Sequence, residues 1–287
     1  MLKLINSHLP WWLKITIKLF ISILPVKLSF WNRYGFFIHG DMLSISYSNK
    51  IFMKHFNRFK SHNKNKIFTM LEIGPGDSVT SALYARNFGA SSVFLIDQDF
   101  YASTDLDFYQ KVISHYSLKN IYFKSKDFKT FLNENNISYL ANGLNSFRHI
   151  KTSSIDFIFS NAVLEHIRKQ DLEEYFIEMK RVLKPGGFIS HTVDLKDHLG
   201  GGLNNLRFSD SFWDSNLVLN SGFYTNRVRM TFFISVLKGL GFQLIFLNKK
   251  KWNKSPINRK SLSLGFRESS NNDLLIKEFD IFMKLKK

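Results

Sequence analysis

The residues most suggestive of chemistry are an acidic strand end followed by two glycines. In "MLEIGPGDS" (Met70 to Ser78), an apolar run reaches Glu72, and Gly74 and Gly76 follow it. Glycine accepts positive φ angles and lets a ligand approach the backbone closely. The stretch is therefore either a tight turn or one wall of a ligand site.

A second carboxylate favours the ligand site. "VFLIDQD" places Asp97 23 residues after Gly74, about where an acid at the end of a second strand meets ribose hydroxyls. The glycine pattern does not continue, because position 79 is Val, and Asp77 puts negative charge where a pyrophosphate would lie. These residues predict a neutral or cationic adenosine ligand rather than a dinucleotide.

Groups suited to acid–base chemistry follow the fifth expected strand. His191, Asp194, Asp197 and His198 stand close together there, and a hydroxyl acceptor needs a base during transfer. Imidazole titrates near neutral pH, so His191 and His198, with Asp194, are the predicted catalytic residues. The alternative is ordinary loop polarity. No third ligand stands at a fixed spacing for Mg or Mn, so no metal is expected.

Substrate contacts are expected further along. Arg207 in "NNLRFSD" is predicted to clamp an anionic substrate group, or else to form a structural salt bridge. Four aromatic residues nearby suit either a sugar-stacking wall or a core: Phe208, Trp213, Phe223 and Tyr224.

The elements that position these groups alternate along the chain. Short apolar runs separated by amphipathic segments are expected as strands at 69–73, 92–96, 137–140, 155–160 and 188–193. "DLEEYFIEMKRVL" is a helix with Asp171 and Glu174 as a capping box, and Pro185 to Gly187 stop it. A late helix and strand precede "FDIFMKLK", expected as an antiparallel edge. The predicted fold class is α/β: a doubly wound, Rossmann-like, seven-stranded, mostly parallel sheet.

The amino terminus is predicted to be separate. Residues 1–66 are expected as a helical extension and residues 67–287 as the main domain, with the boundary in "FKSHNKNK". Within residues 9–31, the longest apolar run is too short to span a bilayer, and lysines interrupt the segment. It is either an amphipathic helix packed on the main domain or a helix in the membrane interface.

The composition limits the compartment and the kinds of partner that are expected. The formal net charge is +17 and there are no cysteines. Disulfides and cysteine-ligated zinc are excluded, and a reducing, cytoplasmic compartment is favoured, with or without membrane association. The basic balance suits an anionic partner or a solvated surface. No zinc finger, arginine-rich helix or RNP-type motif is present, so specific nucleic-acid binding is not expected.

Four motifs in order resemble class I S-adenosylmethionine-dependent methyltransferases: "LEIGPGDS", "LIDQD", "SIDFIFSNAVLEHI" and "MKRVLKPGGFIS". The resemblance covers about residues 67–195 and implies S-adenosylmethionine as cofactor. It places Glu72, Gly74 and Gly76 at the methionine and ribose end and Asp97 at the ribose hydroxyls. It nominates Gly143 and Leu144 near adenine, with Asp127 as the alternative if "IYFKS" is the third strand. Ser160 and Asn161 face the methyl-transfer zone, with His166 beside the cofactor or merely structural.

A narrower resemblance concerns the acceptor. "HTVDLKDHLGGGLNNLRFSD", "NSGFYTNRVR" and "FFIHGDM" resemble uncharacterised methyltransferases associated with bacterial surface-polysaccharide gene clusters. This implies O-methylation of a saccharide or sugar-linked intermediate, in which the acceptor is a small molecule that is anionic or lipid-linked. The alternatives are another small molecule or lipid at the membrane face, and a non-catalytic domain that binds S-adenosylmethionine or a partner. "SNAV" is not an N-P-P-Y-type tetrad, which disfavours methylation of base amines.

Overall fold

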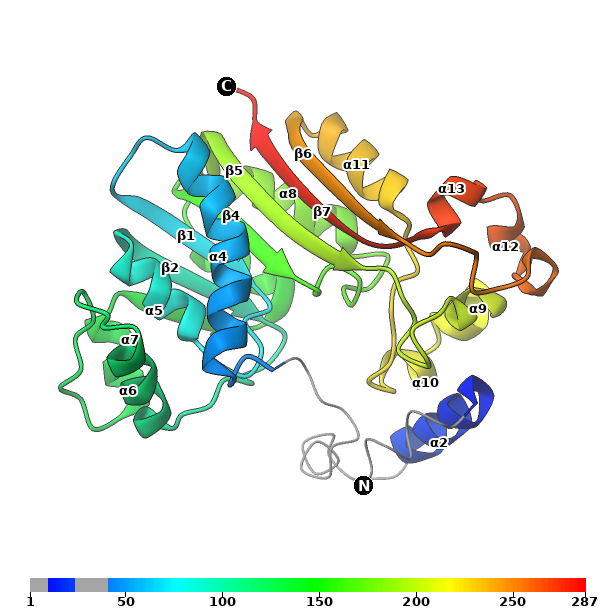
Figure 1. Ribbon diagram of the computed structural model, residues 1–287, viewed down its shortest axis with the longest axis horizontal. Coiled ribbons are helices and arrows are strands. Elements are labelled where there is room, and N and C mark those ends of the chain that lie inside the picture. The colour runs from blue at the N-terminus through cyan, green and yellow to red at the C-terminus, as the bar shows by residue number, and fades with distance from the viewer. Residues whose placement is uncertain (1–9, 24–40) are drawn as a thin grey trace.

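One seven-stranded sheet forms the centre of the computed structural model, which describes residues 10–23 and 41–287 (Figure 1). The strand order is β3-β2-β1-β4-β5-β7-β6; β7 is antiparallel to both neighbours and the other pairs are parallel. This confirms the predicted α/β fold class. The strands are β1 (Phe68–Ile73), β2 (Ala90–Asp97), β3 (Ile137–Ala141), β4 (Ile155–Asn161), β5 (Leu183–Asp194), β6 (Phe242–Lys251) and β7 (Ile276–Leu285).

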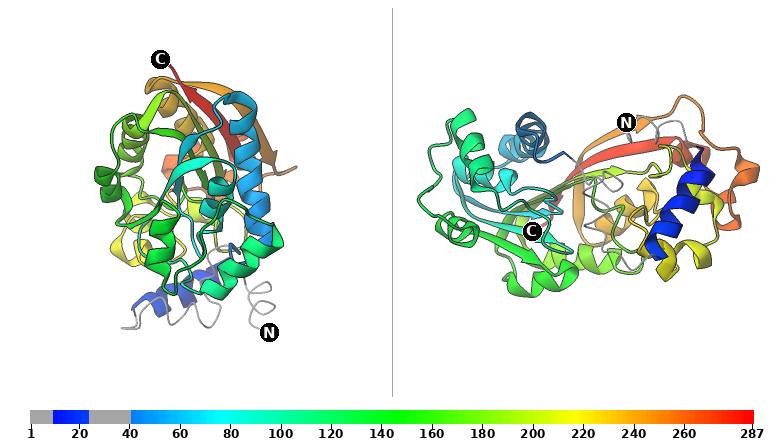
Figure 2. Two further views of the ribbon diagram at one scale, coloured as in Figure 1. Left: turned by 90° about the vertical axis from the view of Figure 1, so that its left-hand side faces the viewer. Right: turned by 90° about the horizontal axis from the view of Figure 1, so that it is seen from below.

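Helices cover both faces of the sheet (Figure 2). The α-helices are α2 (Trp11–Ile23), α4 (Ile45–His62), α5 (Thr80–Asn87), α6 (Leu106–His115), α7 (Phe128–Glu134), α8 (Leu172–Val182), α9 (Asp210–Trp213), α10 (Asn216–Leu219), α11 (Met230–Gly239), α12 (Leu264–Arg267) and α13 (Asn271–Leu274). Short 3-10 helices are η1 (Gly143–His149), η2 (Asn204–Arg207) and η3 (Arg259–Ser261). Helices α4, α5, α6 and α7 pack on one face of the sheet and share a core cluster with it. Helices α8 and α11 and the 3-10 helix η1 share a second core cluster with the other face.

Helix α4 packs tightly on the sheet. Phe52, Phe56 and Phe59 recur at spacings of four and three, so they share one face of the helix, and all three are buried. The Phe59 ring stacks on Phe157 of β4 with 4.6 Å between ring centroids. Although α4 lies within the segment expected to be an amino-terminal extension, its apolar face is part of the sheet's own core.

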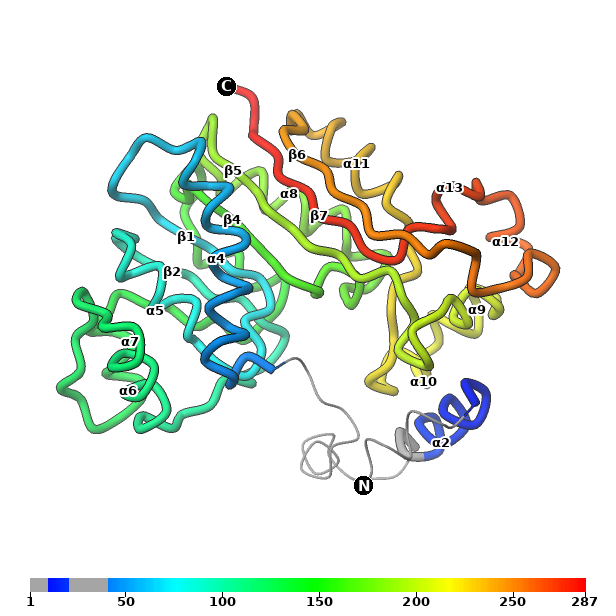
Figure 3. The backbone as a smooth tube through the Cα atoms, in the orientation of Figure 1, coloured from blue at the N-terminus to red at the C-terminus, as the bar shows by residue number. Residues whose placement is uncertain are grey.

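The short elements η2, α9 and α10 follow β5 and lie beyond its carboxyl end. Helix α2 rests on this group, and Ile15 is buried with Trp213 and Phe223 (Figures 1 and 3). The described part of the amino terminus therefore packs on the rest of the chain, while residues 24–31 of the predicted segment lie outside the described residues. Trp12 and Phe20 of α2 are 55% and 66% exposed. Within residues 10–23 and 41–287, no helix combines the length and the apolar character needed to cross a bilayer.

Three local predictions are corrected. Strand β7 is not an edge: it lies between β5 and β6, and Phe279 to Met283 are all buried, which hides the alternation. The edge is β6. Asp171 precedes α8 without a side-chain cap, so the predicted capping box does not form. Pro185 to Gly187 do not stop α8, because it ends at Val182 and they lie inside β5.

Candidate active site

The glycine loop after β1 lies where the strand order reverses, which is where open α/β sheets bind ligands. Gly74 and Gly76 have φ angles of +73° and +66°, so both occupy the left-handed region. The Gly74 amide donates a hydrogen bond of 2.8 Å to the Ile96 carbonyl, which holds the loop against the end of β2. A β-carbon at Gly76 would meet no atom of residues 10–23 or 41–287 within 4 Å, so this glycine borders space that those residues leave open.

Asp97 lies beside this loop at the end of β2. Its Oδ2 accepts a hydrogen bond from the Gly76 amide at 3.2 Å, and its Oδ1 accepts one from the Gln98 amide at 2.8 Å. Burial raises the pKa of Asp97 to about 6, the two amide donors oppose this, and Asp77 and Asp99 add to it. A carboxylate gains free energy by accepting hydroxyl donors here, as the ribose hydroxyls of an adenosine ligand would provide.

Glu72 lies behind the loop rather than in it. Its side chain is buried, and Ser81 of α5 donates a short hydrogen bond to its Oε2. Burial raises the pKa of Glu72 to about 8, although the Ser81 hydrogen bond opposes the shift, and Asp97 adds to it. Glu72 thus ties α5 to the end of β1; its predicted contact with the cofactor stays a prediction.

The third strand is β3, so the alternative built on "IYFKS" is wrong. Asp127 caps α7, where its Oδ1 accepts a hydrogen bond from the Thr130 amide at 3.0 Å. Gly143 and Leu144 begin η1 directly after β3. Gly143 has a φ angle of +49°, and a β-carbon there would lie 2.5 Å from Oε1 of Gln98. The structure therefore brings the Gly143 turn against the residue that follows Asp97.

Ser160 and Asn161 end β4 and project toward opposite faces of the sheet. Ser160 Oγ shares a hydrogen bond of 2.8 Å with Nδ1 of His191 on β5. Asn161 Oδ1 accepts a hydrogen bond from Lys54 Nζ of α4 at 3.3 Å. Lys54 also donates to Thr192 Oγ1 at 2.6 Å and to Asp280 Oδ1 at 3.1 Å. The methyl-transfer zone predicted from β4 thus has a cation on one side and a histidine on the other.

Lys54 was not predicted from the sequence. It lies outside the four motifs, before the first of them, and only the packing of α4 on β4 and β5 brings it to Asn161. Burial lowers the pKa of Lys54, and the Asp280 carboxylate partly opposes that shift. The sequence feature that could have identified Lys54 is its place as a basic residue beside the apolar stripe of "KIFMKHFNRF".

His191 is fully buried within β5. Burial lowers its pKa to about 3, so the ring is neutral at physiological pH. Its Nε2 has no hydrogen-bond partner among the residues that the structure describes. A side chain without exposed surface is poorly placed to take a proton from an acceptor, so this geometry argues against His191 as the base.

Asp194 and Asp197 are held by their own surroundings. Asp194 forms an ion pair of 3.1 Å with Lys196, and its amide donates to Glu165 Oε1 at 3.2 Å. Asp197 is buried and accepts hydrogen bonds from the Leu199, Gly202 and Asn204 amides, which shape the loop that follows. Both carboxylates organise the backbone after β5.

His198 meets His166 at the surface. The two ring centroids are 4.8 Å apart with planes inclined by 36°, and both side chains are exposed. His166 follows β4, and its Nδ1 donates a hydrogen bond of 2.9 Å to the Tyr224 carbonyl. The pair therefore joins the loops after β4 and β5, which border the same edge of the sheet.

Glu165 is a second residue that sequence reasoning missed. It is buried, and burial raises its pKa well above the usual value. Its Oε1 accepts a hydrogen bond from the Asp194 amide, whereas Oε2 is buried and has no hydrogen-bond partner in the described part of the chain. An acid inside the apolar run "AVLEHI" was the signal. The hydrogen bond from the Asp194 amide to Glu165 joins the turn after β4 to the end of β5.

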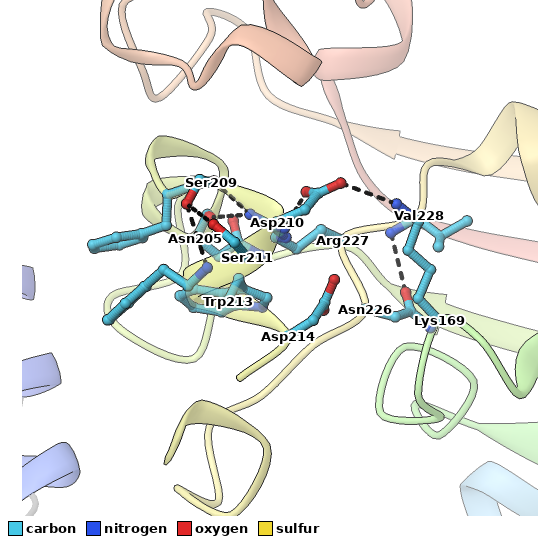
Figure 4. A network of polar contacts seen from close by, with 12 residues as sticks. Lys169, Asn205, Ser209, Asp210, Ser211, Trp213, Asp214, Asn226, Arg227 and Val228 are labelled. Carbon is cyan, nitrogen blue, oxygen red and sulfur yellow. Dashed lines mark hydrogen bonds and ion pairs between the residues drawn. The ribbon is translucent and has the colours of Figure 1, made fainter. Parts of the chain in front are cut away.

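Arg207 lies at the end of η2. Its Nε donates to Asn204 Oδ1 at 3.0 Å, and its guanidinium lies 5.0 Å from the ring of Trp11 in α2. No carboxylate pairs with it among the described residues, so the alternative of a structural salt bridge is not formed. Asp210 nearby pairs with Arg227 and with Lys169 (Figure 4).

The aromatic residues of this region form a core. Trp213, Phe223 and Tyr224 are buried, and Phe208 packs against them together with α2. The Trp213 indole donates to the Thr225 carbonyl at 2.7 Å. Of the two alternatives, the core is therefore the correct one. Among the described residues, no group of three or more His, Cys, Asp or Glu side chains could hold a metal ion.

One family model matches the middle of the chain. Residues 71–190 match the model described as "Methyltransferase domain". This stretch is similar to a methyltransferase domain, so the protein is an enzyme that transfers a methyl group. The match includes every predicted cofactor residue from Glu72 to His166 and stops just before His191.

Solved structures with similar architecture come from several organisms. A SAM-dependent methyltransferase from Methanosarcina mazei is 14% identical, covers 80% of this chain and 97% of its own, and has a TM-score of 0.45. One from Mesorhizobium loti is 12% identical, with 80% and 97% covered and a TM-score of 0.44. Phosphoethanolamine N-methyltransferase 2 from Haemonchus contortus is 17% identical, with 83% and 52% covered and a TM-score of 0.46. No curated protein matches the sequence.

The residues at the switch point fit S-adenosylmethionine, the cofactor that the four sequence motifs imply. The backbone beside Gly76 borders open space, and the Asp97 carboxylate lies against the same loop. Asp77 disfavours a pyrophosphate but suits a ligand with a cationic sulfur. Gly74, Gly76, Asp97 and Gly143 are the residues that would line such a ligand.

Proposed function

We propose that this methyltransferase methylates a hydroxyl oxygen of a saccharide or of a sugar-linked intermediate. The observation that carries the proposal is the His166–His198 pair, which places two exposed imidazoles where the loops after β4 and β5 meet. The resemblance of "HTVDLKDHLGGGLNNLRFSD" and "NSGFYTNRVR" to methyltransferases of surface-polysaccharide gene clusters supports the saccharide.

The chemistry assigns one role to each histidine. When bound, the cofactor supplies a methyl group on a positively charged sulfur, which leaves as a neutral thioether. As the methyl group passes to the acceptor oxygen, His198 would take the hydroxyl proton. His166, held by the Tyr224 carbonyl, positions the His198 ring. His191 is not used as base because it is buried.

The test measures the demethylated cofactor product with a panel of sugars, sugar phosphates and nucleotide sugars. We expect turnover with at least one member, and His198→Ala should lower kcat about 10²- to 10⁴-fold without changing cofactor affinity. His115→Ala, on the exposed end of α6, is the matched control and should keep full activity. Cofactor binding without product from any acceptor would favour the non-catalytic alternative.

A lipid acceptor at a membrane face is the second candidate. It is favoured by Trp12 and Phe20, which are large apolar side chains exposed on α2. Such residues insert into the headgroup region when a helix lies on a bilayer. The candidate predicts co-sedimentation with anionic phosphatidylglycerol vesicles that Trp12→Ala and Phe20→Ala weaken. Equal sedimentation of wild type and both variants would contradict it.

A further inference from the structure

A cavity of about 510 Å³ lies between two segments far apart in the sequence, residues 207–210 and 260–267. This volume suits a small ligand. The Ser263 amide donates to the Leu206 carbonyl at 2.9 Å, so the two walls are joined by a backbone hydrogen bond. The polar side chains of the lining are Arg207, Ser209, Asp210, Lys260, Ser261, Ser263 and Arg267.

The charge of this lining is positive. Within residues 10–23 and 41–287, no carboxylate lies within ion-pair distance of Arg207, Lys260 or Arg267. The one acid of the lining, Asp210, is already compensated by Arg227 and by Lys169, whose Nζ is 3.3 Å away. Three cations therefore face the cavity with no anionic partner of their own, which favours an anionic ligand.

The two arginines are anchored in a way that leaves their outer nitrogens for a ligand. Nε of Arg207 donates to Asn204 Oδ1 at 3.0 Å, and Nε of Arg267 donates to the Leu262 carbonyl at 3.1 Å. Within the described part of the chain, the terminal nitrogens of these two guanidinium groups and Nζ of Lys260 make no hydrogen bond. Guanidinium groups held in this manner suit bidentate recognition of phosphoryl oxygens.

The cavity is coupled to the proposed site of transfer through the loop after β5. Asn204, which holds Arg207, donates its amide to Asp197 Oδ2 at 2.5 Å. Asp197 directly precedes His198. On the other side, Lys169, which pairs with Asp210, is three residues beyond His166 (Figure 4). The lining of the cavity is thus linked by polar contacts to both loops that carry the histidines.

We infer that this cavity binds a phosphoryl group of the methyl acceptor through Arg207, Lys260 and Arg267; this rests on the proposed function for the identity of the ligand as an acceptor. A phosphoryl group offers three oxygens to two guanidinium groups, an ammonium and the serine hydroxyls. A carboxylate offers only two. The acceptor class is therefore a phosphorylated sugar rather than a sugar acid or a neutral glycan.

The test is equilibrium binding of glucose 1-phosphate, inorganic pyrophosphate and glucuronate to the full chain, without turnover. We expect saturable binding of the two phosphate probes and weaker binding of glucuronate. Lys260→Glu and Arg267→Glu should each weaken phosphate binding about tenfold or more. Lys249→Glu, an equal charge change on exposed β6 outside the cavity, should change it less than about twofold.

Titration of S-adenosylmethionine with the same samples shows whether each variant is folded. Equal losses in Lys249→Glu and Lys260→Glu would overturn the inference, because they would reveal only general charge attraction. Tighter binding of glucuronate, or no saturable phosphate binding, would also overturn it. Site-specific phosphate binding without methyl transfer to any sugar, sugar phosphate or nucleotide sugar of the panel would retain the cavity and reject the proposed function. Turnover of a sugar without phosphate binding would reject the cavity alone.

Discussion

Gly74 and Val163 leave no room for a methyl group between them. A β-carbon at Gly74 would lie 2.3 Å from Cγ2 and 2.7 Å from Cγ1 of Val163. Val163 belongs to the turn after β4, so the glycine loop after β1 is pressed against the turn that leads to Glu165 and His166. The two halves of the cofactor site are thus joined by one close contact across the switch point.

This contact predicts that two neighbouring glycines tolerate alanine unequally. Gly76→Ala meets no atom and should cost only the left-handed conformation, about 1–2 kcal/mol of unfolding free energy. Gly74→Ala adds the collision with Val163 and should cost about 1–3 kcal/mol more. Urea denaturation measures both. Val163→Ala should recover part of the loss in Gly74→Ala, and equal losses at the two glycines would contradict the geometry.

Glu72 predicts a stability that depends on pH. Burial raises its pKa from 4.5 to about 8, so the folded protein keeps a proton that the unfolded chain releases. This contribution to stability is therefore lost as pH rises from about 4.5 to about 8. Glu72→Gln still accepts the Ser81 hydroxyl but carries no charge. It should be more stable than wild type by about 1–4 kcal/mol at pH 8 and nearly equal below pH 4.5.

Chemical denaturation at the two pH values tests this. The exposed Glu173→Gln of α8 is the control and should behave like wild type at both. A Glu72→Gln protein that lost stability at pH 8 would show that the charged form is stabilised in the fold.

Asp97 predicts a pH dependence of cofactor binding. Its pKa is raised to about 6, chiefly by burial, so the carboxylate forms as pH rises through about 6. Only the carboxylate accepts both ribose hydroxyls, so affinity for S-adenosylmethionine should fall from pH 7 to pH 5. In Asp97→Asn the affinity should be about tenfold lower and this slope should vanish. Calorimetric titration at pH 5, 6 and 7 measures both, and an unchanged slope in the variant would assign the titration to another group.

Lys54 is expected to stabilise the fold even though its side chain is 30% exposed. Its ammonium binds Asn161, Thr192 and Asp280, and Asp280 is buried. Lys54→Met should cost about 1–3 kcal/mol, because the buried Asp280 then loses its nearest cation and keeps the Thr192 hydroxyl at 2.5 Å and Arg58 at 3.6 Å. Lys250→Met, which breaks the more exposed pair with Glu278, should cost less than about 1 kcal/mol. Thermal unfolding of both variants compares them, and similar small losses would mean that water replaces the Lys54 ammonium.

The sequence by itself determined the local features. Apolar runs marked β1 to β5, and "GPG" and "LIDQD" marked the strand ends that form the cofactor loop. These features can be predicted locally because a strand that is buried on both faces must be apolar and a turn with positive φ angles favours glycine. The third strand was also readable from "ISYLA", while Asp127 was misleading because a helix cap and a ligand contact use the same carboxylate.

Tertiary structure alone decided which polar groups meet and which are covered. Lys54 and Asp280 are 226 residues apart in the chain, and only the packing of α4 and the insertion of β7 beside β5 unite them. His191 and His198 are close in sequence, yet His191 is buried within the sheet and His198 is exposed in the loop after β5. No local pattern distinguishes them, because burial depends on which distant strand pairs beside each residue.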